Sequence, residues 1–227
     1  MSHYVISDLH GESDRFHAML EKIHFSGRDI LYVLGDVVDR GPDGVPLLQE
    51  ILGAPNMVML LGNHEYMCLQ YHSPHATEVE IRRWARNGNG PTLLGLERLR
   101  AKALERLLWD LEALPTHLEV TVAGRRFYLV HGFPGANTHD EVWGRPRLDT
   151  PNPIPDTTLI IGHTPIVFLD KTPEEQEAYS QALTARGDHM RILHAPGFLD
   201  IDCGCGHQLP IKALACLRLE DLAEFYV

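Results

Sequence analysis

Cysteine, long apolar runs and basic side chains are scarce in this chain of 227 residues. The four cysteines are too few and too irregularly spaced for a disulfide framework, so we expect a reduced, cytoplasmic setting. No apolar run is long enough to cross a bilayer, and the first strand begins too early to leave room for a signal peptide. Lys and Arg total 20 against 31 Asp and Glu, a net charge of −11, so neither nucleic acid nor membrane is an expected partner.

The composition is that of a folded domain, because 44% of the residues are hydrophobic and can bury one sizeable core. We find no internal repeat, low-complexity tract or linker along the chain. The sequence therefore predicts a single domain over residues 1–227.

Strands and helices alternate in the first part of the chain. Apolar, β-branched runs at 3–7, 30–34 and 57–61 predict buried strands. Apolar residues at helical spacing predict a helix over 14–24, capped by Ser13 or Asp14, and a second helix over 44–52. Strands separated by helices favour parallel pairing.

The pattern changes after residue 64. A helical cap is expected over about 71–113, with an irregular segment near Arg82–Pro91. Later strands are expected at 118–122, 126–130, 158–161, 198–202 and 213–219, the first two joined as a hairpin through Ala123-Gly124, and they predict a second, more antiparallel sheet. A polar insert over about 170–190, with a helix start at Thr172-Pro173-Glu174, interrupts these strands and is expected to help select substrates.

Three polar strings follow the first three strands directly. They are Asp8-Leu9-His10-Gly11, Gly35-Asp36-Val37-Val38-Asp39-Arg40-Gly41 and Gly62-Asn63-His64-Glu65. The carboxyl ends of strands are where open α/β sheets place their sites, and oxygen and imidazole ligands without thiolate suit hard to borderline divalent metals. Asp8 and His10 lie two positions apart, so in a regular strand they would share one face.

Two further histidines, His131 and His163, each follow an expected strand and lie beside glycine, which makes them candidate ligands. The Cys203-Gly204-Cys205 string has no second cysteine pair, so a tight turn is the better interpretation than a metal or redox site. Either His194 or His207 could line the cleft, and we assign a role to neither.

These strings resemble the metal-dependent phosphoprotein phosphatase family within the calcineurin-like metallophosphoesterases, in particular its compact bacterial and phage-type members. The resemblance implies an α/β fold of two facing mixed β-sheets flanked by helices. It implies two divalent metal ions per chain, with manganese expected and iron or zinc also compatible. In the family pattern Asp8 and His10 bind one ion, Asp36 bridges both, and the second ion is bound by Asn63, His131 and His163.

The resemblance also implies a mechanism in which a metal-bridging hydroxide attacks phosphorus without a covalent enzyme intermediate. Arg40 and Arg145 would bind the phosphoryl oxygens, although Arg147 lies close to the second position. His64 would protonate the leaving group, oriented by Asp39. A salt bridge from Asp39 to its neighbour Arg40 is the alternative for that carboxylate.

Three functions are compatible with these residues. The leading prediction is a serine/threonine protein phosphatase, whose partner would be a phosphorylated protein or a small phosphate ester. The alternative is a hydrolase of dinucleoside polyphosphates such as diadenosine tetraphosphate, for which Trp84 or Trp143 would stack on adenine. A non-catalytic scaffold of the same fold is disfavoured because all six ligand positions and His64 are present.

Overall fold

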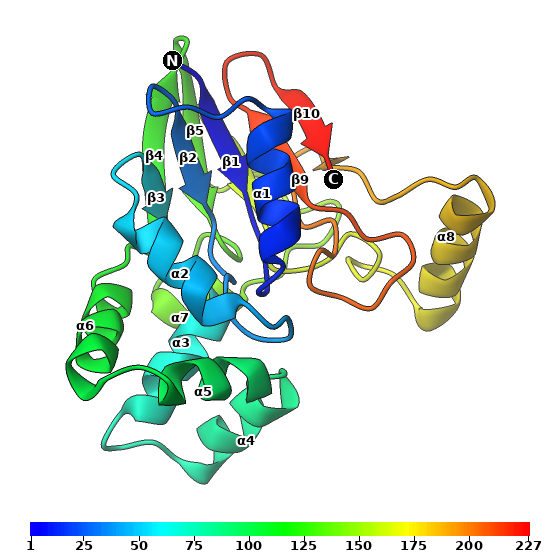
Figure 1. The fold of residues 1–227 in the computed structure, drawn as a ribbon. Coiled ribbons are helices and arrows are strands. Elements are labelled where there is room, and N and C mark those ends of the chain that lie inside the picture. The colour runs from blue at the N-terminus through cyan, green and yellow to red at the C-terminus, as the bar shows by residue number, and fades with distance from the viewer.

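The computed structural model describes residues 1–227, which build two five-stranded β-sheets with helices around them (Figure 1). In the first sheet the strand order is β10–β9–β1–β2–β3. Its strands are β1 (His3–Ile6), β2 (Ile30–Val33), β3 (Met57–Met59), β9 (Ala215–Arg218) and β10 (Ala223–Tyr226). β1, β2 and β3 run parallel, as the alternation of strands and helices predicted, and β9 is antiparallel to β1.

The second sheet has the order β4–β5–β6–β8–β7. Its strands are β4 (His117–Val122), β5 (Arg125–Val130), β6 (Thr158–Ile161), β7 (Leu193–His194) and β8 (Leu199–Asp200). The predicted hairpin through Ala123-Gly124 joins β4 to β5. The α/β fold of two mixed sheets flanked by helices is thus confirmed.

Side-chain alternation divides the core into layers. Val5 points into the cluster between the two sheets, where it lies with Phe127 and Leu129 of β5. Its neighbours Tyr4 and Ile6 point the other way, into the cluster beneath the helices. β1 is apolar on both faces because each of its faces is covered.

Helices α1 (Ser13–Lys22) and α2 (Gly44–Gly53) cover the outer face of the first sheet (Figure 1). Four further helices follow β3 and gather beyond the carboxyl ends of β1 and β2, namely α3 (Asn63–His72), α4 (Glu78–Arg86), α5 (Gly90–Glu97) and α6 (Ala101–Glu112). The last two are α7 (Thr138–Trp143) and α8 (Pro173–Ala185). None of the helices is both long and apolar enough to span a membrane.

Two local expectations were wrong. The residues around Arg82–Pro91 are not irregular, because α4 and α5 occupy most of them. Neither Ser13 nor Asp14 caps α1: the helix already includes both, and the Ser13 hydroxyl donates to Asp43 instead. At Ser13 a tertiary hydrogen bond outweighs the local capping preference, whereas α4 begins in a local capping box formed by Thr77 and Glu80.

The second sheet is also less antiparallel than expected. Its β5–β6 and β6–β8 pairs are parallel, and the strand expected at 213–219 joins the first sheet as β9. Segments of more than twenty residues connect each parallel pair, which gives the crossover room that parallel pairing needs. Strands β7 and β10 were not predicted, and β7 is too short to carry an apolar period.

The backbones of the loops that follow β2 and β3 come into close contact at two glycines. Gly35 has φ +94°, and a Cβ there would lie 2.5 Å from the Gly62 Cα atom. A Cβ on Gly62 would in turn lie 2.3 Å from the backbone nitrogen of Asp36. Only two glycines allow this approach, which brings the second and third polar strings together.

We therefore expect Gly35→Ala to destabilise the fold by about 2–4 kcal/mol, from overpacking plus a strained backbone. Urea denaturation of the purified variant measures this change. Gly27→Ala is the matched control, because nothing lies within 4 Å of a Cβ at that position. Equal unfolding midpoints for the two variants would contradict the close approach.

Candidate metal centre

The site is built from loops held in an unusual backbone conformation. Asp8, His10 and Asp36 have φ values of 55°, 46° and 55°, and Asp39, Arg40 and His163 are also in the left-handed region. These are six of the eleven non-glycine residues with positive φ in the protein. Such strain concentrates at functional sites, where the surroundings hold it in place.

This geometry corrects the expectation that Asp8 and His10 share the face of a strand. β1 ends at Ile6, and both residues lie in the loop beyond it. They still converge, with 4.0 Å between His10 Nε2 and Asp8 Oδ1, because the left-handed turns redirect both side chains.

The six predicted ligands come together in one buried place. Asp36 lies between two groups, with Oδ2 3.7 Å from His10 Nε2 and Oδ1 3.4 Å from His131 Nε2. The amide oxygen of Asn63 meets His131 Nε2 at 2.9 Å and His163 Nδ1 at 2.7 Å. All six residues are at most 7% exposed. Nitrogen and oxygen atoms converging around a shared carboxylate fit a pair of divalent metal ions.

Backbone carbonyls fix the orientation of two of the imidazoles. His10 Nδ1 donates to Val38 O at 2.9 Å, and His131 Nδ1 donates to Leu34 O at 2.7 Å. Each ring therefore presents Nε2 to the centre, as outer hydrogen bonds do in many histidine metal sites. His163 is oriented differently, since its Nδ1 faces Asn63 and its buried Nε2 has no partner.

The histidines of the metal centre differ in the direction of their pKa shifts. Burial holds the pKa of His10 and of His163 well below the usual range, so both are neutral with a lone pair to offer a metal. Burial acts the same way on His131, but the Asp36 carboxylate outweighs it and raises the pKa of His131 to about 9. The imidazoles of His131 and His64 likewise overcome burial and hold the pKa of Asp36 well below its ordinary value.

His64 and Asp39 form a buried pair beside this centre. His64 Nδ1 lies 2.6 Å from Asp39 Oδ2, which also accepts from Trp84 Nε1 at 2.7 Å. The other oxygen of Asp39 accepts from the Thr92 hydroxyl. The alternative salt bridge from Asp39 to Arg40 is not formed, since His64, Trp84 and Thr92 take up the carboxylate. Trp84 has no exposed surface, so it cannot stack on a nucleotide base as the alternative function supposed.

The His64 side chain also approaches the metal-directed groups. Its Nε2 lies 3.8 Å from Asp36 Oδ2, and His64, His10 and Asp36 offer ligand atoms within 4.8 Å of one another. A second such group consists of Asp36, His131 and His163. His64 is therefore close enough to act on a substrate held at the centre or to bind a metal itself.

Two arginines lie at the rim. Arg40 directs one guanidinium nitrogen to His64 Nε2 at 3.1 Å and another to His207 Nε2 at 2.9 Å. Arg145 is exposed, and its charge contributes to lowering the pKa of His163. Arg147 pairs with Asp149 at 3.5 Å, and both side chains are more than 70% exposed. Of the two candidates for the second position, the geometry favours Arg145.

Two residues of the site carried no assigned role in the sequence. Glu65 accepts hydrogen bonds from the backbone N–H groups of Asp36, Val37, Val38 and Gly62. Its spacing of three residues after Gly62 is that of a helix capping box, a signal that could have identified it. His207 contacts Arg40 from a glycine-rich loop, and no local pattern distinguishes it from other histidines.

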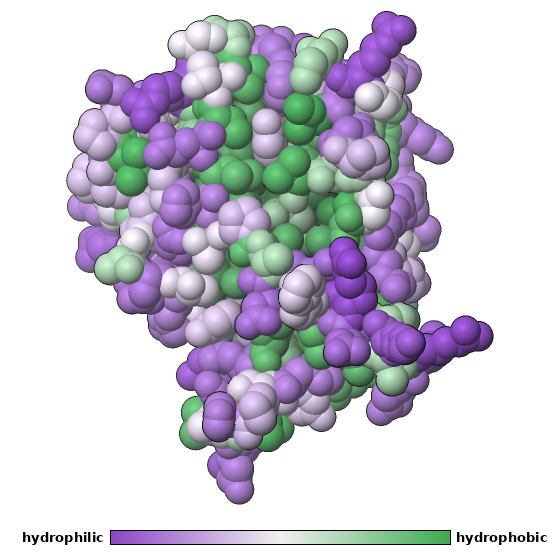
Figure 2. Space-filling view, turned by 90° about the vertical axis from the view of Figure 1, so that its left-hand side faces the viewer, coloured by the Kyte–Doolittle hydropathy of each residue, from purple (hydrophilic) through white to green (hydrophobic).

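A sizeable cavity lies away from the predicted ligands. It has a volume of about 620 Å³, lies between α3 and α6, and includes Leu69, Leu108 and Trp109 in its walls. Figure 2, which views the molecule from the left-hand side of Figure 1, shows apolar surface on that side. None of the predicted ligands lines this cavity, so size alone does not locate the chemistry.

Comparison with known proteins identifies the family to which the chain belongs. The family model for calcineurin-like phosphoesterases matches residues 1–209. The chain belongs to that family, which confirms the resemblance and the expected class of phosphate-ester hydrolase. Membership in a metallophosphoesterase family also supports divalent metal ions as the cofactor, without fixing their identity.

Two of the relatives that match in sequence are enzymes of the same name. A symmetrical bis(5'-nucleosyl)-tetraphosphatase of Paracidovorax citrulli is 33% identical over 133 residues, 58% of this chain and 44% of that protein. The enzyme of the same name from Wigglesworthia glossinidia brevipalpis is 43% identical over 67 residues, 29% of this chain and 25% of that protein. The matched segments thus span less than half the length of these relatives.

Solved structures support the fold. A metallophosphoesterase from Sphaerobacter thermophilus superimposes with a TM-score of 0.59 at 18% identity, covering 100% of this chain and 88% of that one. A serine/threonine phosphatase from Saccharomyces cerevisiae gives 0.59 at 12% identity, covering 97% and 73%. At these identities the likeness concerns the fold.

The protonation of His131 predicts a pH dependence of metal uptake. Below about pH 9 its proton competes with the metal, so we expect Mn²⁺ affinity to rise by up to about tenfold per pH unit between about pH 7 and 9 and then to level off. Calorimetric titration of metal-free protein in two buffers of different ionisation enthalpy counts the protons released. His17→Asn, at an exposed histidine, should behave as wild type. A flat pH profile with no proton release would contradict this protonation state.

Proposed function

We propose that this chain is a metal-dependent hydrolase of dinucleoside polyphosphates such as diadenosine tetraphosphate. The observation that carries the proposal is the match over 133 residues to a symmetrical bis(5'-nucleosyl)-tetraphosphatase. The converged ligand set supports a catalytic role over a non-catalytic scaffold. The sequence relatives favour this function over the protein phosphatase that led the sequence-based predictions.

Asp8, His10 and Asp36 would hold one metal ion, and Asp36, Asn63, His131 and His163 the other. Divalent ions bound there would supply Lewis-acid activation of water and charge for the phosphoryl oxygens. The two carboxylates contribute −2 and the imidazoles and amide are neutral when liganded, so two divalent ions would leave the centre at +2. That local charge attracts polyphosphate to a protein whose net charge is −11.

The protein's own side chains would then position the reacting groups. Arg40 can bind phosphoryl oxygens through two guanidinium nitrogens, and the exposed Arg145, whose charge acts on His163, can bind them as well. His64 Nε2 accepts from the Arg40 guanidinium in this structure, and once protonated it would donate to the leaving group while Asp39 holds Nδ1. Trp84 and Thr92 fix Asp39 in turn, so α4 and α5 of the helical cap orient the proton donor.

The His64–Asp39 pair is also the observation that favours a second candidate function, hydrolysis of phosphoserine or phosphothreonine in proteins. An alkoxide leaves poorly without a proton, so a positioned acid is worth most on such substrates. A nucleoside diphosphate leaves more readily, because the second pKa of a phosphate group is only about 6. The pair can therefore serve protein phosphatase chemistry even if nucleotides are the preferred substrates.

The test is a comparison of kcat/KM on diadenosine tetraphosphate, a phosphoserine peptide panel and p-nitrophenyl phosphate with Mn²⁺ present. We expect diadenosine tetraphosphate to be the best of the three. Chromatography of its products should show ADP alone, the result of symmetrical cleavage. A preference for phosphopeptides, or products other than ADP, would refute the proposal in this form.

We further expect His64→Asn to retain metal and to slow phosphoserine hydrolysis by about 10²- to 10⁴-fold. The loss should be much smaller on diadenosine tetraphosphate and on aryl phosphates with acidic phenols, whose leaving groups need less protonation. Asp39→Asn should show the same bias in weaker form, whereas Arg40→Ala should impair all substrates alike. Metal analysis together with the dependence of rate on leaving-group pKa checks this, and metal loss in His64→Asn would make His64 a ligand instead.

A further inference from the structure

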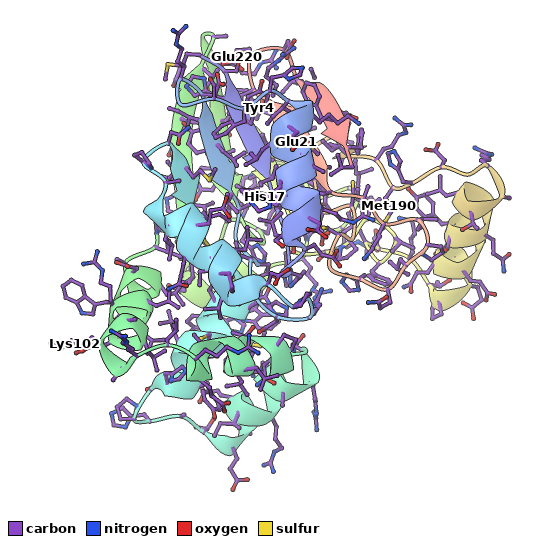
Figure 3. The ribbon with its side chains drawn as sticks, viewed as in Figure 1. Tyr4, His17, Glu21, Lys102, Met190 and Glu220 are labelled. Carbon is purple, nitrogen blue, oxygen red and sulfur yellow. The ribbon has the colours of Figure 1, made fainter.

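The polar insert is a helix held away from the sheets. α8 contains no buried residue and stands apart from the rest of the protein in Figure 1. It begins in a capping box, in which Thr172 accepts from Glu175 N and the Glu175 side chain accepts from Thr172 N. Met190, fully buried at the end of the insert, lies between the sheets and α8 in Figure 3.

A groove of about 390 Å³ separates α8 from the loop that follows β6. A groove of this size can accept a nucleoside. Its lining residues are Val167, Phe168, Pro173, Gln176, Glu177, Ser180, Gln181 and Leu209.

Close contacts connect this groove to the metal centre. The Phe168 ring lies 5.5 Å from the His207 ring, centroid to centroid, and His207 Nε2 lies 2.9 Å from the Arg40 guanidinium. Phe168 also follows the predicted ligand His163 by only five residues. The groove is therefore connected to the Arg40 guanidinium through Phe168 and His207.

The two walls of the groove differ in chemistry. Phe168, Val167 and Leu209 form an apolar wall with one aromatic face. On the α8 wall, Gln176 Nε2 already donates to Lys171 O at 3.0 Å, and Gln181 Nε2 donates to Glu177 at 3.0 Å. Both glutamines thus have their amide oxygens left to accept hydrogen bonds. A flat ring with an exocyclic amino group satisfies both walls.

We propose that this groove binds the purine nucleoside of the leaving group, stacked on Phe168 with its amino edge toward Gln176 and Gln181. The inference rests on the proposed function, since it assigns the nucleoside of a dinucleoside polyphosphate to this surface. His207 lies between the two parts of the substrate, in contact with Arg40 on one side and Phe168 on the other. The groove is lined by Glu177 and by no Lys or Arg, so it would not compete with the metal centre for the phosphates.

The experiment measures KM for diadenosine tetraphosphate and for p-nitrophenyl phosphate with the Mn²⁺-loaded full chain. Phe168→Ala should raise KM for diadenosine tetraphosphate between about 5- and 100-fold, the usual effect of removing a base-stacking aromatic ring. The double variant Gln176→Ala/Gln181→Ala should raise it severalfold. Both should leave KM for p-nitrophenyl phosphate within about twofold, because that substrate has no nucleoside.

Two further variants control for folding and for general effects on α8. Phe168→Leu keeps apolar packing against His207 but removes the ring, so it should lose affinity for diadenosine tetraphosphate while unfolding like wild type. Glu174→Ala lies on α8 outside the groove and should change neither KM. An equal rise in KM for both substrates, or no rise for diadenosine tetraphosphate, would overturn the inference.

Inhibition by products separates failure of this inference from failure of the proposed function. If wild type does not cleave diadenosine tetraphosphate, the proposed function is refuted, and ADP inhibition of p-nitrophenyl phosphate hydrolysis then judges the groove. Weaker inhibition by ADP in Phe168→Ala, with orthophosphate inhibition unchanged, would support a nucleoside site. Unchanged inhibition by ADP would overturn it.

Discussion

The buried carboxylate of Glu65 fixes the loops of the site relative to one another. Glu65, in the first turn of α3, accepts four backbone N–H groups at 2.8–3.2 Å, three of them from the loop that carries Asp36. A carboxylate that accepts several charge-assisted hydrogen bonds replaces the water that the loop would otherwise need. Removing it would leave buried donors unsatisfied, each at a cost of about 1–3 kcal/mol. The positions of Asp36, Asn63 and His64 all depend on this side chain.

The helical cap has a comparable supporting role. Trp84 of α4 and Thr92 of α5 approach Asp39 from outside the sheets and complete its hydrogen bonds. The pair of helices therefore acts through Asp39 on His64, without either of these two side chains reaching the cleft. Because α4 and α5 support the site through Asp39, substrate selection is left to other segments. One of these is α8, whose groove connects to Arg40 through Phe168 and His207.

Much of this arrangement could be predicted from the sequence. The parallel strands followed from β-branched runs separated by an amphipathic helix. The polar strings at their ends supplied four of the six predicted ligands that the fold brings together, and the strand-end histidines His131 and His163 supplied the other two. The direction of β6 and β8 could not be predicted, because strand direction depends on how long connections cross the sheet and not on local pattern. Thr92 and His207 were missed for a related reason, because their partners Asp39 and Arg40 lie 53 and 167 positions away in the chain. Glu65 carried a local signal in its capping-box spacing from Gly62, but its three bonds to the loop of Asp36 span 27 or more positions.

Several residues of the metal centre have a left-handed backbone conformation, so the site is a region where the needs of activity oppose those of stability. Asp and His adopt this conformation more readily than most side chains, but Arg40 and its neighbours still hold backbone strain of about 1–3 kcal/mol per residue. A folded domain has only about 5–15 kcal/mol of net stability in total. Glycine at these positions would relax the backbone strain but remove the side chains that form the site, so selection for a less strained backbone would act against the chemistry of this protein.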